Sequence, residues 1–219
     1  SDVKANQNAE DVRTFIDRVF SVLACALLIT SVVGVLAAPA LVWLIAGGLA
    51  ENAASFDLAT ELTRWMFPYI FFMSLVAMSA GVLNTWKHFA IPAFTPVLLN
   101  LSFITFILFL TPYLERPIFA LAVAVIVGGV LQLGIQIPSL MKLGVLPRPA
   151  NPFKALKDFA VRKVLKLMVP ALFGVGVAQL SLLINTNIAS RLGTGSVTWL
   201  SFADRLMEFP TALLGVALA

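Results

Sequence analysis

The strongest constraint on this chain is a series of apolar runs, each close to the roughly 20 residues with which a helix crosses a bilayer. The chain is 60% hydrophobic and 12% charged, whereas a soluble domain is about 25% charged. Its mean hydropathy is +0.96. The runs lack the alternation of apolar and polar residues that is typical of porin-like strands. The sequence therefore predicts an all-α polytopic membrane protein.

Six transmembrane helices are expected. Their approximate ranges are 19–47, 65–86, 93–110, 118–141, 164–190 and 199–219. The charged stretch 51–64 is expected to be a loop, and 142–163 is the longest polar link. Residues 153–167 (FKALKDFAVRKVLKL) predict an amphipathic basic helix at the membrane surface. Because the first residue is not Met and the last run has no flanking anchor, we expect an excerpt truncated at both ends.

Lysine and arginine are distributed unequally between alternate links. Eleven lie in residues 1–18, 87–92 and 142–166, and three lie in the links between them. Cytoplasmic links of membrane proteins carry an excess of these residues. The bias predicts that the N-terminal end of the sequence is cytoplasmic.

The last apolar run, 199–219, contains the ionisable residues Asp204, Arg205 and Glu208. Each would cost about 2.5–3.5 kcal/mol at the bilayer centre, so these side chains should face protein or water. Asp204 and Glu208 share a helix face, and Arg205 can pair with Glu208 three residues on. Pro210 follows, where a bend is expected. These residues are either a functional site or a structural ion pair at the membrane interface.

The fifth expected helix is unusually polar for one that lies wholly in lipid. Its polar side chains are Gln179, Ser181, Asn185, Thr186, Asn187 and Ser190. Either one face meets a polar cavity, or these side chains form hydrogen bonds between helices. Gln179, Ser181 and Asn185 are therefore weaker candidates for substrate contacts. For Gln132 and Gln136, on one face of the fourth helix, we expect helix–helix hydrogen bonds.

Several kinds of chemistry lack the residues they need. The chain has one cysteine, Cys25, and one histidine, His88, too few for a disulfide or a zinc centre of the usual kind. No Ser/His/Asp set or phosphate-binding glycine loop is recognisable. The net charge of +4 is accounted for by the membrane links and is not a nucleic-acid signal. We therefore expect no enzyme activity, cofactor, metal or nucleic-acid partner.

Residues 203–210 read ADRLMEFP, and 214–217 read LGVA. Further segments, in collinear order, are FPYI at 67–70, LNTW at 83–86, IPAF at 91–94, PVLLN at 96–100, GGVLQ at 128–132, PALFG at 170–174 and QLSLLINTN at 179–187. Together they resemble the MurJ (MviN) lipid II flippases, of the multidrug/oligosaccharidyl-lipid/polysaccharide exporter superfamily. The ADRLMEFP segment is the most specific part of this resemblance.

The resemblance implies a function. The family moves lipid II, the undecaprenyl-pyrophosphate-linked peptidoglycan precursor, across the bacterial cytoplasmic membrane by alternating access, in two six-helix lobes around a cationic cavity. Residues 1–141 would be the last four helices of the first lobe, 142–163 a cytoplasmic linker, and 164–219 the first two helices of the second. Arg205 matches a cavity arginine, and Asp204 and Glu208 match its acidic neighbours. The implied partners are lipid II, membrane lipids and the cell-wall synthesis machinery.

Three alternatives to this function remain. A related exporter would carry another lipid-linked saccharide or a drug. A membrane enzyme of prenyl-phosphate sugars would need metal-binding carboxylates near a membrane face, where the sequence offers only Asp204 and Glu208. A scaffold of the cell-wall assembly machinery would have no use for a charge at Arg205.

Overall fold

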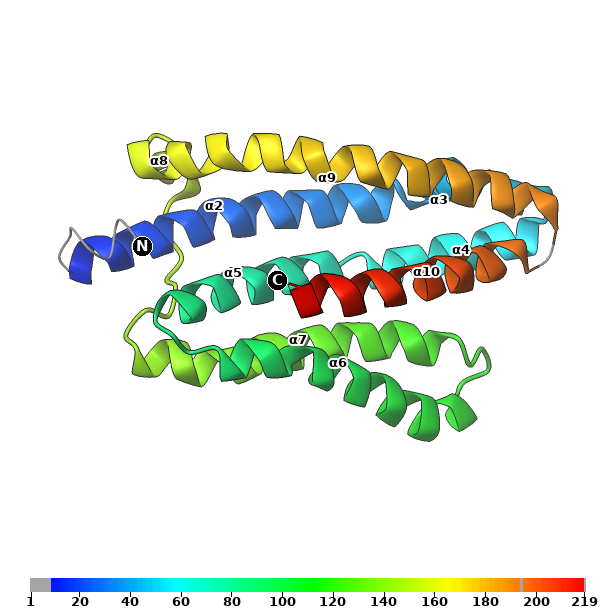
Figure 1. The fold of residues 1–219 in the computed structure, drawn as a ribbon, viewed down its shortest axis with the longest axis horizontal. Coiled ribbons are helices and arrows are strands. Elements are labelled where there is room, and N and C mark those ends of the chain that lie inside the picture. Colours follow the sequence, from blue (N-terminus) through cyan, green and yellow to red (C-terminus); the bar gives the residue numbers. More distant parts are fainter. Residues whose placement is uncertain (1–8, 194, 219) are drawn as a thin grey trace. The chain divides into compact units, whose positions relative to one another are not determined.

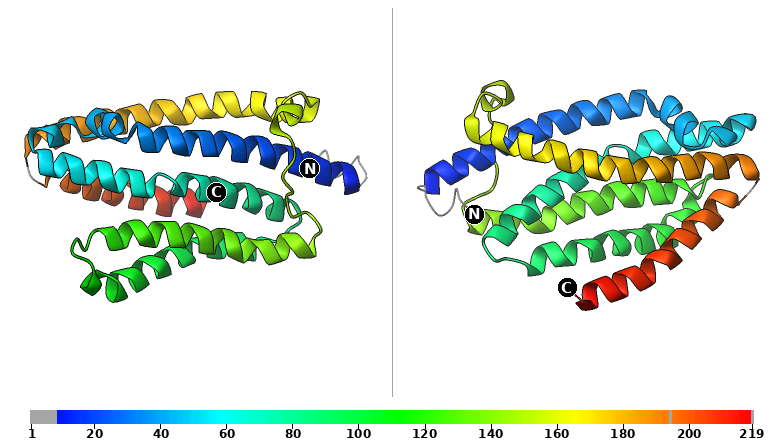
Figure 2. Two further views of the ribbon diagram at one scale, coloured as in Figure 1. Left: turned by 180° about the vertical axis from the view of Figure 1, so that it is seen from behind. Right: turned by 45° about the horizontal axis from the view of Figure 1, so that its top comes forward.

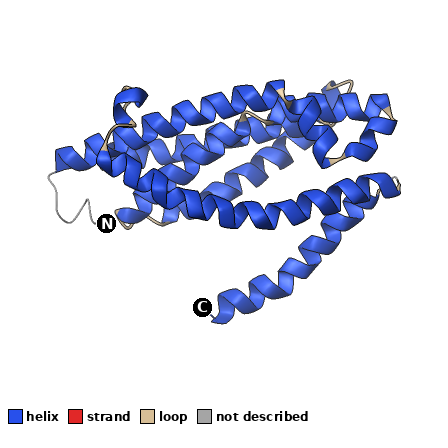
Figure 3. Ribbon diagram, turned by 90° about the horizontal axis from the view of Figure 1, so that it is seen from above, coloured by secondary structure: helices blue, strands red, loops and turns tan. Residues whose placement is uncertain are grey.

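The computed structural model describes residues 9–193 and 195–218, and all regular elements in these ranges are helical (Figures 1 and 3). In chain order they are α2 (Ala9–Leu36), α3 (Ala38–Ile45), η1 (Gly47–Glu51), α4 (Ala53–Met66), α5 (Tyr69–Thr85), α6 (Ala90–Phe109), η2 (Thr111–Tyr113), α7 (Phe119–Lys142), α8 (Pro152–Ala155), α9 (Phe159–Leu192) and α10 (Ser196–Leu218).

Five helical segments within the described residues are long and apolar enough to cross a membrane. They are Glu10–Leu36, Ala53–Thr85, Ala90–Phe109, Phe119–Lys142 and Phe159–Leu192. The prediction of an all-α polytopic membrane protein is confirmed, whereas a sixth spanning helix is not.

The first expected span is two helices rather than one. A turn at Ala37 separates α2 from α3, and Pro39 lies in the first turn of α3. Proline fits the first turn of a helix but not its interior, because it lacks an N–H and its ring clashes with the preceding turn. The expected end at Gly47–Gly48 is confirmed, since α3 stops at Ile45 and the short 3-10 helix η1 follows.

The prediction that residues 51–64 form a loop is wrong. They lie largely in α4, whose start is marked by Asn52, where Oδ1 accepts a hydrogen bond of 3.2 Å from the backbone N–H of Ser55. Charged side chains keep a segment out of hydrocarbon but do not oppose helix formation, and asparagine is a favoured N-cap. A turn at Phe67–Pro68 then leads into α5.

The single amphipathic helix expected over 153–167 is also wrong, because it is interrupted before Phe159. The one-turn helix α8 ends at Ala155, and α9 starts anew behind Asp158. The Asp158 carboxylate accepts hydrogen bonds from the backbone N–H groups of Ala160 (2.9 Å) and Val161 (3.2 Å). It thereby satisfies donors that have no partner within the first turn of a helix.

The chain divides into two compact units. One comprises the described residues up to Leu36 together with Leu62–Val169, and the other comprises Ala37–Glu61 and the residues from Pro170 onward. In the first unit α7 packs against α5 and α6, and α2 packs against α5 (Figure 2). The centre of its core consists of Val12, Ile16, Leu83, Leu140 and Val145.

Two adjacent glycines allow α7 to pack closely within the first unit. A Cβ at Gly128 would lie 2.7 Å from Leu99 Cδ1 of α6, and a Cβ at Gly129 would lie 2.9 Å from Phe72 Cβ of α5. Small residues allow such approach between membrane helices, where van der Waals packing and hydrogen bonds drive association. The GGVLQ segment is therefore explained by packing.

Hydrogen bonds across the helices accompany this packing. Gln132 is 1% exposed; its Nε2 donates to the Thr95 carbonyl of α6 (3.0 Å), and its Oε1 accepts from the Tyr69 hydroxyl of α5 (3.4 Å). Gln136 is fully buried and donates from Nε2 to the Val76 carbonyl of α5 (3.3 Å). The prediction of helix–helix hydrogen bonds for both glutamines is confirmed.

The link between α7 and α9 is anchored on the polar first half of α2. Asp17 Oδ1 accepts from the backbone N–H of Arg148 (2.7 Å), and Arg18 forms an ion pair with Asp158. The pKa of the Asp158 carboxyl is lowered from 3.8 by the hydrogen bond from the Val161 N–H, and further by the Ala160 N–H and the Arg18 guanidinium, while burial acts in the opposite direction.

We predict that Asp158→Ala destabilises the protein by about 1 kcal/mol, the usual cost of losing an N-cap. Asp158→Asn should cost less, because asparagine keeps the cap and loses only a partly exposed ion pair.

The stabilisation by the Asp158 carboxylate should depend on pH. Because the pKa of this carboxyl is lower in the folded protein than in the unfolded chain, the carboxylate stabilises the fold fully at a pH above the unfolded pKa. The stabilisation is lost as the pH falls through the pKa of the folded protein. The advantage of aspartate over asparagine should therefore be complete near pH 6, begin to fall as the pH approaches the unfolded pKa of 3.8, and vanish only below the lower pKa of the folded protein. Thermal unfolding in detergent tests both points, and equal stability of all three proteins at pH 6 would contradict them.

We further predict that Gln132→Leu lowers the stability of the first unit by about 0.6–1.7 kcal/mol, the range measured for hydrogen bonds between membrane helices. The change removes the bonds from the Gln132 amide to the Thr95 carbonyl and from the Tyr69 hydroxyl to the Gln132 amide. Asn100→Leu, at an exposed position of α6, is the matched control. Thermal unfolding of both variants is the measurement, and equal shifts would show that the Gln132 bonds do not stabilise the packing.

Candidate functional site

The second unit contains every predicted site residue. The helix α10 carries Asp204, Arg205 and Glu208 near its middle. Ser201, Arg205 and Glu208 follow one another at spacings of four and three residues, so they share a helix face, and all three are exposed. Asp204 lies beside them and is partly buried.

Arg205 remains available to an external anion. Among the described side chains, no ion pair joins Arg205 to Asp204 or Glu208. A guanidinium carries five N–H donors in a planar fork that matches carboxylate and phosphate oxygens. The helix continues through Pro210, which cannot donate to the Leu206 carbonyl.

The weaker candidates occupy exposed positions of α9. Gln179, Ser181 and Asn185 are all exposed. At about 100° per residue, Asn185 projects about 160° away from Asn187, which bonds to α3. The structure therefore separates the polar residues of this helix into an exposed set and a set that contacts other elements.

Asn187 and Ser190, which the sequence analysis did not select, contact the end of α3 and the start of η1. Asn187 Nδ2 donates to the Leu44 carbonyl (2.9 Å), and Ser190 Oγ accepts from the backbone N–H of Gly48 (3.0 Å). A Cβ at Gly48 would lie 2.1 Å from the Ser190 carbonyl oxygen, so only glycine permits this approach. The Gly-Gly pair after an apolar run was the signal in the sequence that could have indicated such a contact.

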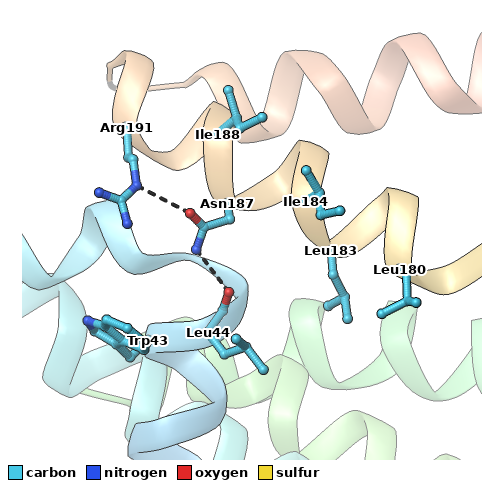
Figure 4. Close-up of a pocket in the computed structure, with 8 residues that line it drawn as sticks. All are labelled: Trp43, Leu44, Leu180, Leu183, Ile184, Asn187, Ile188 and Arg191. Atoms are coloured by element: carbon cyan, nitrogen blue, oxygen red, sulfur yellow. Dashed lines mark hydrogen bonds between the residues drawn. The ribbon is translucent and has the colours of Figure 1, made fainter.

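A pocket of about 400 Å³ lies beside this contact, between α3 and α9 (Figure 4). Its lining consists of Trp43, Leu44, Leu180, Leu183, Ile184, Asn187, Ile188 and Arg191. In the close-up, Asn187 links the Leu44 carbonyl to the Arg191 guanidinium, whose Nε donates to Asn187 Oδ1 (3.2 Å). The pocket is apolar except for this end.

The two helices that carry the candidates diverge after the turn that joins them (Figures 2 and 3). Gly193 and Gly195, which lie between these two helices in the sequence, have φ values of 134° and 95°, which favour glycine. Within the described residues, no group of three His, Cys, Asp or Glu side chains could hold a metal ion. The site is therefore a surface of charged and polar groups on apolar helices.

Comparison with known proteins gives a consistent family. The family described as lipid II flippase MurJ matches residues 2–219. The lipid II flippase MurJ of Burkholderia cenocepacia is 53% identical over 219 residues, which is 100% of this chain and 42% of that protein. Probable lipid II flippases MurJ of Vibrio cholerae (40% identical, 98% of this chain) and Buchnera aphidicola subsp. Acyrthosiphon pisum (36%, 99% of this chain) also match over 42% of their lengths. The chain thus spans about two fifths of these curated relatives.

We predict that Gly48→Ala disrupts the contact between η1 and α9 and destabilises the second unit by about 1–3 kcal/mol, as overpacking does. The new methyl group would collide with a backbone atom, which cannot rotate away as a flexible side chain can. Gly81→Ala in α5 is the matched control, because a Cβ there meets nothing within 4 Å. Thermal unfolding of both variants is the test, and an unchanged Gly48→Ala protein would refute the contact.

Proposed function

Because the chain belongs to the lipid II flippase MurJ family, we propose that it is part of a protein that carries lipid II from the inner to the outer leaflet of the bacterial cytoplasmic membrane. The observation that supports a direct role for this segment is Arg205, an exposed arginine of a largely apolar helix that makes no ion pair with its neighbours Asp204 and Glu208. A charge in such a position is a functional-site hypothesis by default, because burying it in lipid is costly.

Arg205 binds the pyrophosphate of the lipid or the adjoining part of its head group. A guanidinium and a phosphate form paired, charge-assisted hydrogen bonds, which are shorter and stronger than bonds between neutral groups. Glu208, one turn along the same exposed face, balances the charge of Arg205 when no substrate is bound. Asp204, partly buried beside it, orients the guanidinium. Gln179, Ser181 and Asn185 are further polar contacts along the path of the head group.

Transport by alternating access needs no covalent step, so the protein acts as a transporter and not as an enzyme. Residues 1–141 belong to the first lobe, residues 142–163 link the lobes, and residues 164–219 open the second. The excess of lysine and arginine in the links at 1–18, 87–92 and 142–166 assigns those links to the cytoplasm. Arg205 then lies in the outer half of its helix. Membrane lipids surround the protein, and the cell-wall synthesis machinery receives its product.

We predict that Arg205→Ala in the full-length protein greatly reduces outer-leaflet lipid II in cells depleted of the native flippase. Charged hydrogen bonds contribute about 1.5–3 kcal/mol, which corresponds to about 10- to 100-fold weaker binding of the head group. Arg205→Lys should transport at an intermediate rate, because lysine keeps the charge and loses the paired geometry.

The matched control is Arg64→Ala, which removes an exposed arginine from the end of α4. Membrane abundance of every variant is measured in parallel, so that loss of protein is not mistaken for loss of transport. Normal outer-leaflet lipid II with an abundant Arg205→Ala protein would contradict the role given to Arg205.

A further inference from the structure

Within the second unit, two segments far apart in the sequence are joined by hydrogen bonds. One is the end of α3 with the start of η1, Leu44 to Gly48, and the other is the last turn of α9, Asn187 to Arg191. The two hydrogen bonds between them join residues 143 and 142 positions apart. Each bond pairs a side chain of α9 with a backbone group of the other segment.

The backbone groups involved are those that helix ends leave without partners. The Leu44 carbonyl belongs to the last turn of α3, and the Gly48 N–H belongs to the first turn of η1. Neither position has a partner within its own helix. Asn187 and Ser190 therefore act as caps supplied by a distant helix.

Arg191 and Gly47 complete the geometry. The Arg191 Nε–H donates to Asn187 Oδ1, which turns the amide so that its Nδ2 faces the Leu44 carbonyl. A Cβ at Gly47 would lie 3.0 Å from Arg191 Nη2, so glycine at this position leaves room for the guanidinium. We therefore regard Arg191 as a positioning residue for Asn187.

We infer that these residues form a latch between the two lobes, which holds the outer end closed and must open to release the transported lipid. The inference rests on the proposed function, in which α3 belongs to the first lobe and α9 to the second. The charge bias of the links assigns this end of α9 to the outer face. The latch (Leu44, Gly47, Gly48, Asn187, Ser190 and Arg191) would then join the lobes on the side where the lipid leaves.

The chemistry of the latch suits a contact that opens repeatedly. Hydrogen bonds between membrane helices are individually weak. The groups that opening would uncover are polar, and at the outer face they would meet water, which can replace the lost bonds. An opening in hydrocarbon would leave the same groups without partners.

The test uses the full-length protein with its cysteine at position 25 replaced (Cys25→Ser) and the pair Leu44→Cys and Ile188→Cys, two positions that line one pocket across the latch. A short, reducible bis-methanethiosulfonate linker joins the two thiols. We expect the linked protein to lose delivery of lipid II to the outer leaflet, and reduction of the linker to restore it.

Two controls isolate the latch. Phe15→Cys with Gly81→Cys links α2 to α5 within the first lobe, across a pocket that both positions line and where a Cβ at Gly81 meets nothing within 4 Å, and this link should leave delivery intact. In the Leu44→Cys, Ile188→Cys background, Asn187→Leu should lower the yield of the link by removing the bond to the Leu44 carbonyl.

The outcomes separate the latch from the proposed function. If the Leu44–Ile188 link forms and delivery continues at the unlinked rate, the latch is refuted while the flippase function stands. If the link does not form in membranes, the contact is absent there and the latch is again refuted. If the Cys25→Ser protein without the two added cysteines delivers no lipid II while its abundance is normal, the proposed function itself fails.

Discussion

The demand that every backbone N–H and C=O find a partner governs this structure. In hydrocarbon no water is available, so apolar segments form helices, which satisfy these groups internally. The groups that still need partners are the N–H and C=O groups at the ends and interruptions of the helices. Asp158 caps α9 and Asn52 caps α4, each beside its own helix in the sequence. Asn187 and Ser190 do the same for α3 and η1 from a helix more than 140 residues away.

Polar side chains on these apolar helices serve two distinct purposes. Gln132 and Gln136 are almost fully buried, bond to neighbouring helices and strengthen the packing of α5, α6 and α7. Arg205 and Glu208 are exposed and make no ion pair with each other. A buried polar group with partners is sufficiently explained by packing, whereas an exposed charge on an apolar helix needs a ligand or water. This difference is what makes Arg205 the stronger candidate for substrate contact.

Much of the fold could be predicted because it follows from local pattern. Long apolar runs predicted membrane-spanning helices, and the spacing of Gln132 and Gln136 predicted bonds to neighbouring helices. Two of the wrong predictions also have local causes. Residues 51–64 were assigned to a loop because they are charged, although charge does not oppose helix formation. Residues 153–167 were assigned to one helix from their amphipathic spacing. Aspartate, however, is favoured at the N-cap and disfavoured in the interior of a helix, and Asp158 caps the start of α9.

The sequence by itself determined the helical class, the course of most spans and the grouping of Asp204, Arg205 and Glu208 on one short stretch, because hydrophobicity and helical spacing are properties of neighbouring residues. Only the tertiary structure decided that Asn187, and not Asn185, contacts α3, and that Gly48 lies against Ser190. Two asparagines on one helix look equivalent in sequence. They differ because only one face of α9 contacts the neighbouring segment. The shape of that segment, in which Gly47 and Gly48 follow the end of α3, determines which face this is.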